Sequence, residues 1–94
     1  MKGRKRISEL DEMFKRYEEI IAKPADENEC QVILLELVTT ATTITDVGLA
    51  SKFESRWMDF KDKVQLLADE RIFRDAQNEI DMHLIGILDP ESAT

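Results

Sequence analysis

Apolar residues recur along this chain at the three- and four-residue spacing of amphipathic helices. In the first stretch, the spacings are 3, 4, 3 and 4 for Ile7, Leu10, Phe14, Tyr17 and Ile21. Charged residues occupy the opposite face. Pro24 ends the stretch, because the residue before a proline is driven out of the helical region. The pattern predicts a first helix over residues 5–23.

The second stretch opens with a helix-start signal at Asp26, whose carboxylate can accept backbone N–H groups of a first turn. One face then carries Cys30, Leu34, Leu37, Ala41 and Ile44. The β-branched run 39–45 would also suit a strand. The stretch continues for about 20 residues, however, which is far longer than a usual strand. Because Gly48 also offers a left-handed helix stop, we predict a second helix over 26–47.

The third stretch begins with a capping box formed by Ser51 and Glu54. Its apolar stripe consists of Phe53, Trp57, Phe60, Val64 and Leu67. Half of the aromatic residues of the chain lie on this stripe, which is therefore expected to be the centre of the core. The pattern predicts a third helix over 51–68.

After Ala68 the apolar positions change phase. At about 100° per residue, the new stripe would point away from Trp57 if the chain continued as one straight helix. A fourth helix over 70–88 therefore either follows a minimal turn or continues the third helix past a kink. We predict an all-α fold, a small bundle of three to four antiparallel helices in one domain over residues 1–94, with a flexible basic arm at 1–6 and a tail at 89–94.

A stripe of this size outside the core is typical of an interface. The expected protein-interface residues are Ile72, Phe73, Ala76, Ile80, Leu84 and Ile87. The same reasoning predicts a homodimer, because a second subunit would cover the stripe.

The charge of the chain indicates which class of partner it can bind. The net charge is −7, although residues 1–6 contribute four positive charges: Lys2, Arg4, Lys5 and Arg6. The remaining residues hold 9 basic and 20 acidic groups and so carry −11. A body this acidic repels nucleic-acid phosphates and suits a partner protein that is basic or has an apolar groove. No apolar run reaches the roughly 18 residues of a membrane span, and a single cysteine suits a reducing cytoplasm.

The sequence offers few residues for chemistry. His83 is the only histidine and Cys30 the only cysteine, and there is no glycine-rich phosphate loop. We therefore expect no catalytic, cofactor or metal site, and no enzyme. His83 is expected to be a hydrogen-bonded residue at the core boundary, and Cys30 a small buried apolar side chain.

These features give the chain the general character of small acidic helical proteins that bind another protein, such as secretion chaperones, immunity proteins and phage-encoded modulators. The leading hypothesis is an intracellular adaptor, chaperone, inhibitor or modulator. One alternative is a DNA-associated regulator that uses Lys2, Arg4, Lys5 and Arg6, or a divergent helix-turn-helix over 44–57. A second alternative is an acidic inhibitor that competes with nucleic acid for a basic protein.

Overall fold

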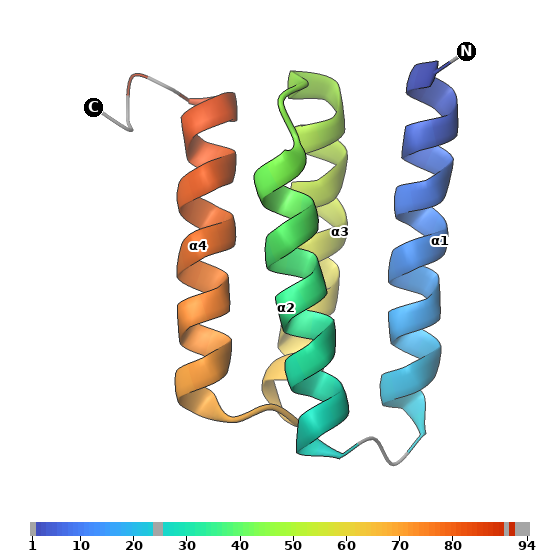
Figure 1. The fold of residues 1–94 in the computed structure, drawn as a ribbon, viewed down its shortest axis with the longest axis vertical. Helices are drawn as coiled ribbons and strands as arrows, with labels where there is room; N and C mark the ends of the chain where they lie inside the picture. The colour runs from blue at the N-terminus through green and yellow to red at the C-terminus, as the bar shows by residue number, and fades with distance from the viewer. Residues whose placement is uncertain (1, 24–25, 90, 92–94) are drawn as a thin grey trace.

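The computed structural model describes residues 2–23, 26–89 and 91, with side chains from Ser8 onward. It contains four helices: α1 (Lys2–Ala22), α2 (Glu27–Thr43), α3 (Val47–Gln65) and α4 (Glu70–Leu88). The described residues form no strand, so the all-α prediction is confirmed. In Figure 1 the chain runs down α1, up α2, down α3 and up α4.

Three of the four sides of this bundle are closely packed. α3 packs against both α1 and α4, and α4 packs against α2. On the fourth side, the described backbones of α1 and α2 hardly approach one another, and α1 stands apart from α2 in Figure 1. The molecule is flattened, with extents of 38 × 33 × 18 Å. The side between α1 and α2 is therefore the loosest part of the fold.

Aromatic rings fill the centre of the core, as the stripe of the third stretch predicts. Phe14 of α1 packs edge-on against Phe53 and Phe60, with ring centroids 5.3 and 5.8 Å apart. Trp57 stacks on Phe73 of α4 at 6.1 Å. Edge-to-face and offset-stacked pairs at these distances stabilise a core beyond the apolar area that they bury.

The stripe on α4 belongs to this same core, so within one chain it is not the exposed apolar face from which the interface was predicted. The exposed fractions of Phe73, Ala76, Ile80 and Leu84 are 7% or less, and Ile72 and Ile87 pack against the buried cluster. The chain reverses over residues 66–69 and does not continue as one kinked helix. Because the chain reverses here, the apolar stripe of α4 faces the core.

The reversal needs neither proline nor glycine. The Asp69 carboxylate accepts the N–H groups of Arg71 and Ile72 at 3.0 and 3.2 Å. It thereby satisfies donors that the first turn of α4 leaves unpaired. The new helix thus starts from its own cap at Asp69, and its bounds match the predicted fourth helix over 70–88.

The boundary between α2 and α3 also differs from the prediction. α2 ends at Thr43, Ile44 is extended, and α3 begins after Asp46 instead of at Ser51. The Asp46 carboxylate accepts the N–H of Leu49 at 2.8 Å. Gly48 lies inside α3 without a positive φ, so it is not a helix stop. A Cβ on Gly48 would lie 3.1 Å from Asp46 Oδ2, so the glycine leaves room for the cap.

The predicted arm at residues 1–6 and the predicted tail at residues 89–94 fall only partly within the described residues. The backbone is already helical from Lys2, three residues earlier than predicted, so the expected arm is part of α1. The side chains of Lys2, Arg4, Lys5 and Arg6 lie outside the described residues, as does most of the predicted tail.

Asp46→Ala is expected to lower the free energy of unfolding by about 0.5–2 kcal/mol, the usual effect of losing an N-cap. Ser51→Ala, at an exposed position inside α3, is expected to change it by less than about 0.5 kcal/mol. Urea denaturation of the two variants measures the difference. A larger loss for Ser51→Ala would place the start of α3 at Ser51 after all.

Candidate protein-binding surface

α2 is the helix with the least charge on its exposed face. Glu36 is its only charged residue between Cys30 and Thr43, and the chain has no lysine or arginine between Lys23 and Lys52. Val32 and Leu35 project outward with exposed fractions of 55% and 66%. A surface helix normally presents a charged or polar face to water. The outward face of α2 is therefore less charged and more apolar than the face that a surface helix normally presents to water.

The side between α1 and α2 is hollowed at two places, which together form what we call the α1–α2 groove. The lower hollow has a volume of about 450 Å³ and is lined by Arg16, Tyr17, Ile20, Asp26, Asn28, Glu29, Val32, Ile33 and Glu36. The upper hollow has a volume of about 190 Å³ and is lined by Glu9, Leu10, Met13, Thr40, Thr43, Ile44 and Leu49. Both hollows open to solvent and lie between apolar side chains of the two helices.

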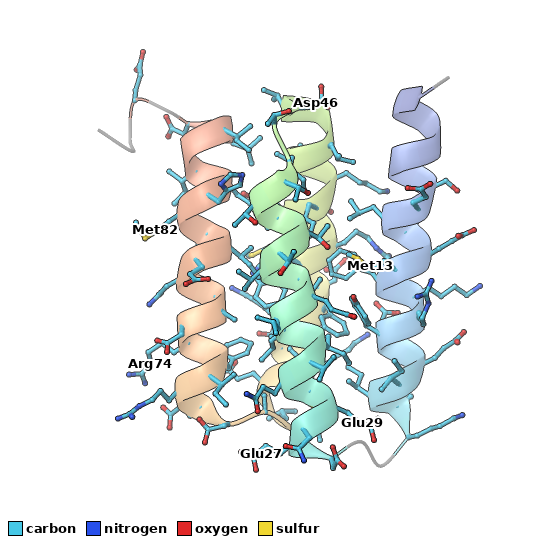
Figure 2. The ribbon with its side chains drawn as sticks, in the orientation of Figure 1. Met13, Glu27, Glu29, Asp46, Arg74 and Met82 are labelled. Atoms are coloured by element: carbon cyan, nitrogen blue, oxygen red, sulfur yellow. The ribbon has the colours of Figure 1, made fainter. Side chains whose placement is uncertain are left out.

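Two side-chain contacts bridge the groove and separate its hollows. The Tyr17 hydroxyl donates a hydrogen bond to Glu36 Oε2 at 2.7 Å. The Thr40 hydroxyl lies 3.8 Å from Met13 Sδ, and Figure 2 shows Met13 between the two helices. These two side-chain contacts therefore join α1 and α2 across the side of the bundle where their backbones lie far apart.

The electrostatics of the groove are one-sided. Among the described residues that line it, the carboxylates are Glu9, Asp26, Glu29 and Glu36, and the one cation is Arg16. Glu29 lies with Glu27 at the lower end of α2, where Figure 2 labels both. A groove with apolar walls and an acidic rim is complementary to a segment that is apolar and basic.

The Tyr17–Glu36 contact perturbs the phenol. Burial raises the pKa of Tyr17 well above its usual range, the hydrogen bond to Glu36 and the charge of that carboxylate act in the same direction, and Arg16 opposes them. The neutral phenol is therefore the form that the folded protein holds.

This perturbation predicts a loss of stability in alkali. An unfolded tyrosine ionises near about pH 10, whereas Tyr17 stays protonated in the folded state, so the folded state binds more protons and its stability falls as pH rises above that value. The chain has one tyrosine, so tyrosinate absorbance reports Tyr17 alone. We expect this absorbance to appear together with the loss of helical circular dichroism. The stability of Tyr17→Phe should fall less steeply with pH. Ionisation near pH 10 in a protein that stays folded would contradict the prediction.

The single cysteine and the single histidine have the structural roles that the sequence predicts. Cys30 is buried, and burial raises the pKa of its thiol, with the charges of Glu29, Asp26 and Glu27 acting the same way. Such a thiol is poorly disposed to react as a thiolate. His83 Nε2–H donates to the Ile44 carbonyl oxygen at 3.0 Å, which confirms a hydrogen-bonded boundary residue and ties α4 to the end of α2.

Described residues also line hollows outside the α1–α2 groove. One, of about 170 Å³ between α2 and α4, includes Leu35, Ile72 and Glu79. The other, of about 420 Å³ at the foot of α1 and α3, includes Ile21 and Leu66. Neither hollow combines an apolar wall with several carboxylates, so neither offers the α1–α2 groove's complementarity to a basic segment.

Of the DNA-binding alternative, the structure describes only the helix-turn-helix version, and its two cations on α3 are engaged within the molecule. Lys52 and Arg56, on the helix that would enter a groove of DNA, lie 3.5 and 3.6 Å from Asp11 of α1. The Arg56 guanidinium also lies over the Phe14 ring, 5.8 Å from its centroid. Packing within the molecule therefore engages these cations. Within the described part of the chain there is no cluster of metal-ligating side chains, and no helix is long and apolar enough to cross a membrane.

Sequence reasoning did not find the groove or the Tyr17–Glu36 contact. The signal that was available is the absence of lysine and arginine from the whole of α2 and its flanks. No protein-family model, curated protein or solved structure matches this chain.

Proposed function

We propose that this protein binds a basic segment of a partner protein over the exposed face of α2 and the α1–α2 groove. The observation that carries the proposal is the composition of α2, which lies on the surface but carries one charge between Cys30 and Thr43. Depletion of charge is typical of the buried centre of interfaces. Covering Val32 and Leu35, which are already partly buried, would contribute about 1–2 kcal/mol each.

The charge distribution supports a basic partner. α2 holds three acidic residues and no basic one, and the described lining of the α1–α2 groove has four carboxylates against Arg16. Complementary charge speeds association and rejects acidic surfaces. The role we propose is that of an adaptor, chaperone, inhibitor or modulator that masks a basic segment, acts without catalysis and works in the cytoplasm. An inhibitor that displaces nucleic acid from a basic protein is one form of this proposal.

A second copy of the chain is a poor occupant of this face. In a two-fold contact across α2, Glu36 would approach its own symmetry mate, and no basic residue of α2 is present to compensate. The stripe that favoured a homodimer is also part of the core. We therefore propose a monomer that meets a different protein.

Site-specific photo-crosslinking tests the proposal in the cells from which the protein comes. A photoreactive phenylalanine analogue replaces Leu35 on α2 or, as the control, exposed Ser55 on α3. We expect one discrete adduct from position 35, none from position 55, and a weaker adduct when Glu36→Lys reverses the charge. An adduct of two copies of this chain, or equal adducts from both positions, would contradict the proposal.

A further inference from the structure

We infer that the α1–α2 groove receives one amphipathic helix of the partner, with a basic residue of that helix paired to Glu36 between two apolar anchors. This inference rests on the proposed function and specifies the conformation and the residue pattern of the bound segment.

The walls of the groove favour a helix over an extended segment. Both walls are helices, whose backbone N–H and C=O groups are already paired within α1 and α2. An extended peptide in the groove would lose water from its own backbone groups without gaining backbone partners, which opposes its binding. A helix brings its backbone hydrogen bonds with it. Its side chains then supply the packing that this side of the bundle lacks.

The two hollows set the spacing of the anchors. Val32 lines the lower hollow and Thr40 the upper one, eight residues further along α2. Eight residues of helix span roughly 12 Å. On a partner helix that lies along the groove, the positions on one face that match this span are i and i+7 or i+8. One apolar side chain then enters each hollow.

Glu36 lies midway between Val32 and Thr40 along α2. On the partner helix, the position opposite Glu36 is the one between the two apolar anchors. Glu36 Oε2 accepts a hydrogen bond from the Tyr17 hydroxyl at 2.7 Å, which holds the carboxylate on the wall of the lower hollow. Glu36 is exposed, so a lysine or arginine at i+4 of the partner helix can reach its carboxylate. The expected pattern is an apolar residue, a basic residue four positions later, and a second apolar residue three or four positions after that.

A designed helical peptide with leucine at i and i+7 and lysine at i+4 provides the probe, and the same peptide with glutamate at i+4 is the control. Titration into the isotope-labelled protein should shift the amide signals of Tyr17, Val32 and Thr40. The glutamate peptide should bind more weakly. Glu36→Gln should weaken binding of the lysine peptide by about two- to fivefold, the range of a partly exposed ion pair. Glu79→Gln removes the same charge beside the α2–α4 hollow and should leave binding unchanged.

Two results would overturn the inference. Signal shifts around Ile72 and Ala76, with Glu79→Gln as the weakening variant, would move the bound helix to the other side of α2. Equal affinity of the lysine and glutamate peptides, or no shift in the groove, would remove the Glu36 pairing. Crosslinking from position 35 reports separately on the proposed function, so either result can be told apart from failure of that function.

Discussion

The Ile80→Asp variant is expected to be unfolded at room temperature. Ile80 is fully buried in the core cluster, where an aspartate would be a charge without water or a partner. A buried unpaired charge destabilises by several kcal/mol, which is comparable with the total stability of about 5–15 kcal/mol of a small domain. Far-UV circular dichroism and the fluorescence of Trp57 should both show the unfolded chain. Met82→Asp, two residues along on the exposed side of α4, should keep the native spectra.

The same pair of variants distinguishes the folded-back α4 from the interface that the sequence predicts. If Ile80→Asp kept its helical spectrum and native Trp57 emission, and only dissociated an oligomer, the α4 stripe would face a second subunit. That outcome would contradict the reversal of the chain over residues 66–69.

Phe14→Ala is expected to lower the free energy of unfolding by about 3–5 kcal/mol. The Phe14 ring has no exposed surface and contacts the rings of Tyr17, Phe53 and Phe60. Its removal leaves a cavity that the surrounding rings cannot fill without leaving their packed positions. Urea denaturation followed by circular dichroism measures the loss.

Leu35→Ala is the matched control for this measurement. Leu35 is 66% exposed, so the change in free energy of unfolding should stay within about 0.5 kcal/mol. A loss comparable with that of Phe14→Ala would mean that the outward face of α2 is held in the fold. Its apolar character would then need no partner to explain it.

Much of the fold was predictable because each helix carries its own periodic stripe. The stripe from Phe53 to Val64 correctly identified the centre of the core, and Asp26 caps α2 as predicted, accepting the N–H of Glu29 at 2.8 Å. The length of the second stretch also outweighed the strand preference of its threonines. These features depend on local spacing and on side chains that hydrogen-bond within one turn.

The predictions failed where two local helix-start signals competed, or where a contact between distant parts of the chain determined the structure. Asp46 and Ser51 both resemble N-caps, and the structure selects Asp46, while His83 binds the Ile44 carbonyl on the preceding turn. The change of phase in the α4 stripe was correctly described. Whether that stripe faces the core or the solvent, however, depends on the direction of the chain after Leu66. A four-residue turn capped by Asp69 reversed that direction without the glycine or proline that commonly marks a turn.

The groove could not be predicted from the stripes, because it depends on the separation between α1 and α2. Only the low charge of α2 was visible in advance. The low charge of α2 indicates an exposed apolar face only when the structure shows that Val32 and Leu35 lie on the surface.

Sedimentation equilibrium of the intact wild-type protein at micromolar concentration tests the central claim most directly, namely that the face of α2 is free for a different protein. We predict the mass of one chain, because the α4 stripe is covered by the protein's own core and the acidic α2 face repels its copy. The mass of two chains would contradict the proposed monomer, since a second copy would then be available to cover the exposed apolar face of α2.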